Sequence, residues 1–237
     1  MTTYKVESLD QLHQVFSGYR SKNGQRFWFR GHADSTWRLV PSAGRPGFRL
    51  PDNKDLERCN EWCQDAHSLT NFPESFIERL AIAQHHGLAT RLLDWTKNPL
   101  VACFFAVSTL PESEGAIYAL EALSLHRRVP DRTDEYELDD VKGILGYQPK
   151  AINPRLVSQQ GLFTVHCPAH LDLPVAESLF ELNETNVRKF VIPSEQKKKI
   201  RQMLDNYGVN EATLFPDLDG LARYVNRQTQ DMHFRNF

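Results

Sequence analysis

The sequence predicts a mixed α+β fold built as one domain over residues 1–237. With 237 residues and 41% hydrophobic side chains, the chain can bury one large core. Apolar, aromatic runs such as 26–29 and 115–120 are typical of buried strands, whereas other segments repeat apolar residues at helical spacing. These strands and helices follow one another without a repeating strand–helix–strand order, which favours α+β over α/β.

Local signals place the individual elements. Ser8, with Gln11 three residues later, forms a capping-box pattern for a helix that ends near Tyr19. Gly87 follows the apolar face of a second helix, and Pro99 takes the first position of a third. Ser194 is expected to cap a basic helix, and residues 126–150 are expected to form a surface excursion. Helices are predicted at 8–19, 53–68, 74–86, 99–107 and 194–207, with a last helix that follows the tail at 215–221. Strands are predicted at 25–30, 90–94, 115–120, 161–166 and 189–193.

Composition excludes several classes of protein. A net charge of −2 argues against a protein that coats nucleic acid or anionic membrane. Because there is no run of 18 apolar residues and no apolar signal segment, we expect a cytoplasmic protein without a membrane partner. The four cysteines lack the spacing of a zinc site, so we expect structural thiols and no metal. The lysine run 197–199 is interpreted as a solvated helix face, with a phosphate-contact patch as the alternative.

Arg30 forms the first polar island, at the end of an aromatic strand and directly before Gly31 and His32. The planar guanidinium suits phosphate, carboxylate or ribose oxygens, and the glycine would let a ligand approach the backbone. The alternative is a structural ion pair that closes the strand end.

A second polar island, residues 84–99, lies between two apolar helices. Since unpartnered buried polar groups are costly, this segment is either surface loop or a mutually hydrogen-bonded network. Arg91 and Asp94 are predicted to pair, and Thr96 or Asn98 to cap the next helix. A third island, residues 153–163, contains amides that cannot act as general bases at neutral pH, and a plain strand-entry turn is its alternative. We predict that the three islands form one site.

The residues of these islands resemble the FRG-domain family, which is named for its Phe-Arg-Gly motif. The resemblance lies in residues 29–32, in the segment 80–102, in 159–163 and in 215–218, and it spans about 8–226 with a motif core at 25–226. His86 replaces the family's usual aromatic residue, and Ala89 its usual proline. The family occurs in bacteria and phages, often near defence genes, which implies an effector or toxin in bacterial and phage conflict.

The order of the motifs is also similar to that of arginine-type mono-ADP-ribosyltransferases. In those enzymes an aromatic-Arg-Gly strand precedes a Ser-Thr-Ser strand end with a following helix, and a Glu-x-Glu comes later. This resemblance implies an ADP-ribosyltransferase-like fold, with NAD as the cofactor, Arg30 on a phosphate or ribose, and Thr96 on the nicotinamide ribose. Gln160 stands in the region where the catalytic glutamate is expected, and Asp94 could substitute for it electrostatically.

The combined expectation is an NAD- or nucleotide-binding transferase with a protein or nucleic-acid acceptor. One alternative is a non-catalytic sensor or binding module for a nucleotide, a nucleic acid or a phage protein. Another is a hydrolase or nuclease that uses His32, His85 and Asp94. The residues expected to be catalytic are Arg30, His32, Asp94 and Gln160, and those expected to bind the nucleotide are Arg30, Gln84, His85, Arg91, Thr96, Asn98, Arg155 and Phe163.

Overall fold

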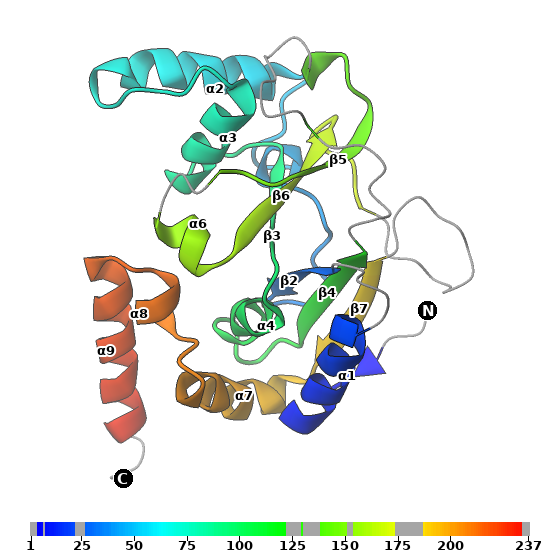
Figure 1. Ribbon diagram of the computed structural model, residues 1–237, viewed down its shortest axis with the longest axis vertical. Helices are drawn as coiled ribbons and strands as arrows, with labels where there is room; N and C mark the ends of the chain where they lie inside the picture. Colours follow the sequence, from blue (N-terminus) through cyan, green and yellow to red (C-terminus); the bar gives the residue numbers. More distant parts are fainter. Residues whose placement is uncertain are drawn as a thin grey trace.

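Seven strands form one mixed sheet in the computed structural model of the chain (Figure 1). The structure describes residues 4–6, 8–21, 27–121, 129, 138–150, 154–173 and 187–233. The strand order is β1-β7-β4-β2-β3-β6-β5, with β1 parallel to β7 and the other neighbours antiparallel. The strands are β1 (Tyr4–Lys5), β2 (Phe27–His32), β3 (Leu92–Thr96), β4 (Gly115–Glu121), β5 (Gly143–Tyr147), β6 (Gly161–Cys167) and β7 (Val187–Ile192).

The helices pack on this sheet, so the predicted α+β class is confirmed. Asn98 caps α4 as predicted, because its Oδ1 accepts from the Leu100 amide at 3.0 Å. Ser8 Oγ likewise accepts from the Gln11 amide at 3.2 Å. The helices are α1 (Leu9–Ser21), α2 (Lys54–Asp65), α3 (Phe76–His85), α4 (Pro99–Val107), α6 (Pro154–Ser158), α7 (Ser194–Asn206), α8 (Glu211–Leu214) and α9 (Leu218–His233).

Several predicted boundaries are wrong, because pairing between strands overrides the local signals. Strand β2 continues through Gly31 to His32, since every residue of β2 pairs with β4. Strand β3 begins at Leu92 and ends at Thr96, two residues later than predicted. The expected surface excursion contains β5, which is held by β6, while much of the rest of that excursion lies outside the described residues. Ser194 does not cap α7, because it is the helix's first residue and Pro193 precedes it without a side-chain bond.

The sheet is divided into two halves at its centre. Strands β2 and β3 are paired at a single position, Phe29 with Thr96, whereas β2 and β4 are paired along their whole length. One hydrophobic cluster joins α1, α4 and α7 to the β7-β4-β2 half, and a second joins α2 and α3 to the β3-β6-β5 half. A third cluster spans both halves, because it contains Trp28 and Tyr118 from one half and Trp95 and Leu162 from the other. The boundary between β2 and β3 therefore lacks most of its strand pairing but shares this hydrophobic cluster.

Gly31 serves packing of α4 on β2, which corrects the expectation that it admits a ligand. A Cβ at Gly31 would lie 1.9 Å from the Ala102 carbonyl oxygen and 2.7 Å from the Ala106 amide nitrogen. The face of β2 on which Gly31 lies is therefore covered by the backbone of α4.

Lys197 does not belong to a solvated lysine face, which corrects the interpretation of residues 197–199. Its side chain is buried, and its ammonium group donates to the main-chain oxygens of Ala33, Thr109 and Leu110 at 2.6–3.1 Å. Two loops are thereby tied to α7. The neighbouring lysines of the run are exposed.

The cysteines, the possible metal ligands and the helices bear on the expectations about thiols, metals and membranes. All four cysteines are free and buried. Within the described ranges, no three His, Cys, Asp or Glu side chains are grouped so that they could hold a metal ion. None of the described helices combines the length and the apolar character that crossing a membrane requires.

Candidate functional site

Arg30 and Asp94 meet where the two halves of the sheet separate. Phe29 pairs with Thr96, so these two side chains lie on the same face of the sheet. Because side chains alternate along a strand, Asp94 lies on the face of Thr96 and Arg30 on the opposite face. The guanidinium nevertheless reaches across, and Arg30 Nη1 donates to the main-chain oxygen of Asp94 at 2.6 Å. The same nitrogen lies 3.6 Å from the Asp94 carboxylate. Arg30 thus bridges the split in place of the missing strand pairing.

His32 holds the Arg30 guanidinium in this position. Arg30 Nε donates to His32 Nε2 at 2.8 Å, so the other ring nitrogen carries the proton and faces the Trp37 carbonyl oxygen at 3.3 Å. Burial, assisted by the nearby Arg30 charge, lowers the pKa of His32 from 6.5 to about 3. Both ring nitrogens are engaged and the ring is neutral near pH 7, so His32 orients Arg30 and is poorly placed as a general base.

The Asp94 carboxylate is the exposed group at the centre of the site, with 63% of its side chain accessible. Gln84 Nε2 donates to Asp94 Oδ1 at 2.7 Å. Thr90 in turn donates its hydroxyl proton to Gln84 Oε1, and its Oγ1 accepts from the Leu92 amide. This relay runs from the backbone to the carboxylate, and it fixes the direction in which the Asp94 oxygens point.

Arg155 brings a second positive charge to Asp94 from α6, which lies between α3 and α8 (Figure 1). Burial lowers the pKa of Arg155, and the nearby Asp94 carboxylate offsets part of that shift. The guanidinium carbon lies 4.6 Å from the ring centroid of Phe215. His85 is close enough for burial and the Arg155 charge to lower its pKa.

Sequence reasoning missed Arg223, which comes from α9. Its guanidinium carbon lies 4.8 Å from the same Phe215 ring. The sequence carries no spacing signal for this contact, because Arg223 is brought to Phe215 by the turn at residues 215–217 that precedes α9. The tail motif that includes Phe215 was the one available hint.

Thr96, Asn98 and the glutamines build the floor of the strand end through their own hydrogen bonds. Thr96 Oγ1 donates to the Gln159 carbonyl oxygen at 2.6 Å and accepts from the Asn98 amide. The Gln159 side-chain amide donates to the Leu214 carbonyl oxygen at 3.0 Å. Gln160 is exposed with φ of 47°, and no hydrogen bond joins its side chain to Arg30 or Asp94 in the described part of the chain.

Arg91 and Phe163 lie in the interior. The Arg91 side chain is 0% exposed and is held by both oxygens of Asp55 at 2.8 and 2.9 Å. The predicted pairing of Arg91 with Asp94 is therefore wrong, because α2 supplies a buried carboxylate that the sequence does not place nearby. Phe163 stacks on Tyr147 within the second hydrophobic cluster.

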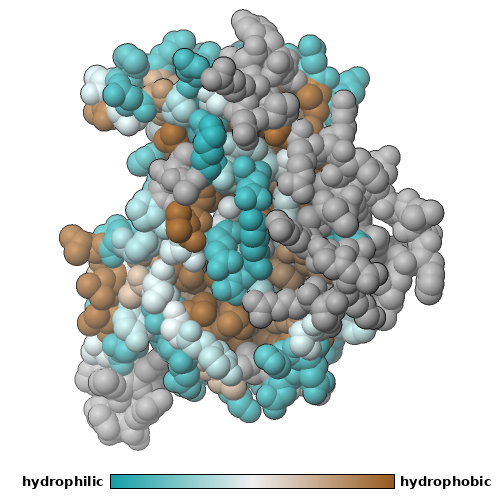
Figure 2. Space-filling model, in the orientation of Figure 1, coloured by the Kyte–Doolittle hydropathy of each residue, from teal (hydrophilic) through white to brown (hydrophobic). Residues whose placement is uncertain are grey.

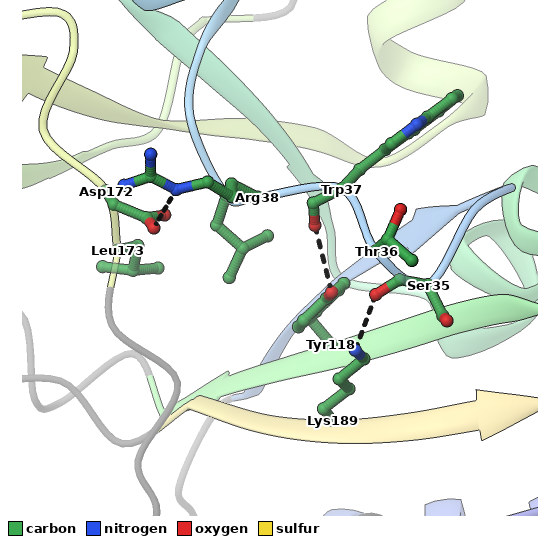
Figure 3. A pocket seen from close by; sticks show the side chains of 9 residues that line it. Ser35, Thr36, Trp37, Arg38, Tyr118, Asp172, Leu173 and Lys189 are labelled. Atoms are coloured by element: carbon green, nitrogen blue, oxygen red, sulfur yellow. Dashed lines mark hydrogen bonds and ion pairs between the residues drawn. The ribbon is translucent and has the colours of Figure 1, made fainter.

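A separate hollow of about 210 Å³ is lined in part by Trp37 and Tyr118 (Figure 3). The rings of both residues contact His32. The polar groups of the hollow bond to one another: Lys189 to the Ser35 carbonyl oxygen, Tyr118 to the Trp37 carbonyl oxygen, and Arg38 to Asp172. The Trp37 indole points away from Tyr118 and Lys189 in this view. These bonds fix the loop that carries Trp37, whose carbonyl oxygen faces His32. The loop that lines the hollow therefore helps to hold His32 in place.

Taken together, the three predicted islands converge in part. Arg30, His32, Gln84, Asp94 and Arg155 are connected by hydrogen bonds or by charge, whereas Arg91 and Phe163 are used by the core. Figure 2 shows hydrophilic side chains gathered in the middle of this view of the molecule, with apolar patches over α6 and α9. An oriented carboxylate between two guanidinium groups can bind hydroxyl groups and stabilise positive charge, while the cations can hold phosphate.

Comparison with protein families identifies the first two of these islands. A family model described as the FRG domain matches residues 25–114. The chain therefore contains an FRG domain at residues 25–114. The matched part of the FRG domain contains Arg30, His32, Gln84 and Asp94, whereas Arg155 and Arg223 lie beyond it. Comparison with curated proteins and with solved structures gave no match.

Proposed function

We propose that this FRG-domain protein is an ADP-ribosyltransferase-like effector that binds and turns over NAD or a related nucleotide. The observation that carries the proposal is the oriented Asp94 carboxylate, held by Gln84 at 2.7 Å and set beside the Arg30 guanidinium at 3.6 Å. An NAD-type substrate offers groups that suit these residues: ribose hydroxyls for the carboxylate and phosphates for the guanidinium groups.

Asp94 is the group assigned to the reacting sugar. Cleavage of the bond between ribose and nicotinamide leaves positive charge on the sugar, and a fixed carboxylate stabilises that charge. In this role Asp94 substitutes for the glutamate that the resemblance leads one to expect where Gln159 and Gln160 stand. Arg30 is a positioning residue, since two of its donors are already bound to His32 and the Asp94 backbone.

The family's occurrence in bacteria and phages, often near defence genes, leads us to place the activity in conflict between them. A protein or a nucleic acid would then be the acceptor of the ADP-ribosyl group. In that case the acceptor nucleophile forms the new bond to the sugar, nicotinamide leaves with the electron pair of the broken bond, and the acceptor's proton passes to Asp94 or water.

Labelled NAD tests the proposal. The protein is incubated with NAD and with candidate protein and nucleic-acid acceptors, and nicotinamide release and label transfer are measured. Wild type should release nicotinamide, Arg30→Ala should reduce the rate about tenfold or more, and Asp94→Asn should reduce it about a hundredfold or more. Arg49→Ala, an exposed arginine outside the site, is the matched control and should behave as wild type. Intact NAD with both wild type and Arg30→Ala contradicts the proposal.

A second candidate function is a sensor or binding module that holds its ligand without turnover. It is favoured by the glutamine pair, because Gln159 is committed to the Leu214 carbonyl oxygen and neither amide supplies a charge. Calorimetry separates the two functions. Binding of NAD or another nucleotide that is lost in Arg155→Ala, without nicotinamide release, supports the module, and measured turnover rules it out.

A further inference from the structure

Two arginines from distant parts of the chain share one aromatic ring at the edge of the site. Arg155 on α6 and Arg223 on α9 place their guanidinium carbons 4.6 and 4.8 Å from the centroid of Phe215. Cation–π contact fixes the position of each guanidinium without neutralising its charge. The pair therefore brings two positive charges to one aromatic ring.

Neighbouring arginines show how charge is balanced elsewhere in this region. Arg201 and Arg227 are both paired with Asp205 and Glu211 at 2.6–3.2 Å. Within the described residues, neither Arg155 nor Arg223 forms an ion pair of this kind. The nearby Asp217 carboxylate already accepts from the Gly220 amide at 2.7 Å and so caps the first turn of α9. The two arginines at Phe215 are thus the cations of this region that retain donors for a ligand.

We propose that Arg155 and Arg223 form a clamp for two adjacent phosphate groups. Each guanidinium offers a planar set of donors that matches phosphate oxygens, and two of them suit a pyrophosphate better than a single phosphate. Asp94, whose carboxylate offsets part of the lowering of the Arg155 pKa, gives the proposed clamp a direction: the clamp would hold phosphates at Phe215, with a sugar toward Asp94. The inference rests on the proposed function for that sugar, and it makes α9 part of the binding site.

Titration of inorganic pyrophosphate into the full chain, followed by calorimetry at low salt, tests the clamp directly. Wild type should bind, and Arg223→Ala should weaken the affinity about tenfold or more, as expected for the loss of a charge-assisted hydrogen bond. Arg223→Glu should abolish binding. Arg223 is exposed, so these variants should keep the thermal unfolding midpoint of wild type. Arg49→Ala is again the matched control and should bind as wild type.

Absence of pyrophosphate binding by wild type, or equal affinity of wild type and Arg223→Ala, overturns the clamp. Parallel titrations with ADP and with a single-stranded oligonucleotide show whether the phosphates come from a nucleotide or from a nucleic-acid backbone, and either ligand should depend on Arg223. Binding is measured without turnover, so the two proposals fail separately. Pyrophosphate binding without NAD turnover contradicts only the transferase, and NAD turnover that is indifferent to Arg223 contradicts only the clamp.

Discussion

Arg30 Nη1 donates to the main-chain oxygen of Asp94 at 2.6 Å, across the line where β2 and β3 stop pairing. A side chain thus satisfies a carbonyl oxygen that a continuous ladder would pair with another strand. The bond has a functional consequence, because it sets a guanidinium beside an exposed carboxylate. The Phe-Arg-Gly motif combines this role of Arg30 with the close packing of Gly31 on α4.

Gly31→Ala should destabilise the fold strongly. The new Cβ would overlap the Ala102 carbonyl oxygen at 1.9 Å, and backbone cannot move away as a flexible side chain can. We expect a loss of about 1–3 kcal/mol or more in the free energy of unfolding, measured by urea denaturation. Gly47→Ala is the control, because nothing lies within 4 Å of its Cβ position. Equal midpoints for the two variants would show that α4 does not press on β2.

Asp55→Ala should lower the free energy of unfolding by about 3–5 kcal/mol, because it leaves the fully buried Arg91 guanidinium without its carboxylate partner. Lys5→Ala provides the contrast. Lys5 and Glu114 form an ion pair 4.0 Å long at the surface, and its loss should cost about 0–1 kcal/mol. Denaturant midpoints measure both effects, and a small loss for Asp55→Ala would contradict the buried pairing.

Acid should destabilise the protein through His32. The folded pKa of about 3 lies below the ordinary 6.5, so between these values the unfolded chain binds the extra proton. Stability is therefore fully present above pH 6.5 and is lost as pH falls toward 3, at about 1.4 kcal/mol per pH unit for this group. Burial also lowers the pKa of His166, to about 4, which adds to the slope over most of this range.

His32→Gln separates this contribution from the rest. The glutamine can still accept the Arg30 hydrogen bond but does not titrate. The slope of the free energy of unfolding against pH should therefore fall by about 1.4 kcal/mol per pH unit, the contribution of one proton. The exposed His67→Gln is the control and should retain the His32 contribution. Thermal unfolding midpoints measured from pH 7 to pH 4 test this, and an unchanged slope in His32→Gln would contradict the assignment.

Asp94→Asn should remove turnover of NAD while the fold is retained. The amide can replace one carboxylate oxygen in shape, but it supplies no negative charge to a cationic sugar. We expect at least about a hundredfold lower nicotinamide release, and thermal unfolding within about 1 kcal/mol of wild type because the side chain is 63% exposed. The exposed Glu112→Gln, outside the site, is the charge-matched control. Undiminished turnover in Asp94→Asn would remove Asp94 from the chemistry.

Local patterns predicted most elements of the fold correctly. The helix that begins at Pro99, the strand at 115–120 and the strand at 161–166 each carry signals within their own residues, such as a cap, a proline or an apolar run. Strand β5 carries no comparable signal, because its residues become a strand only by pairing with β6. The ends of β2 likewise depend on its pairing with β4.

For the site, the sequence by itself determined which polar residues interrupt the apolar frame, because such residues cannot be buried without partners. Arg30, Gln84, Asp94 and Arg155 could be named on that ground. Only the tertiary structure decided the partners: Asp55 for Arg91, His32 for Arg30, and Phe215 for Arg155 and Arg223. These contacts join residues far apart along the chain, and a charge or donor is satisfied by whatever the packing of distant elements brings near it.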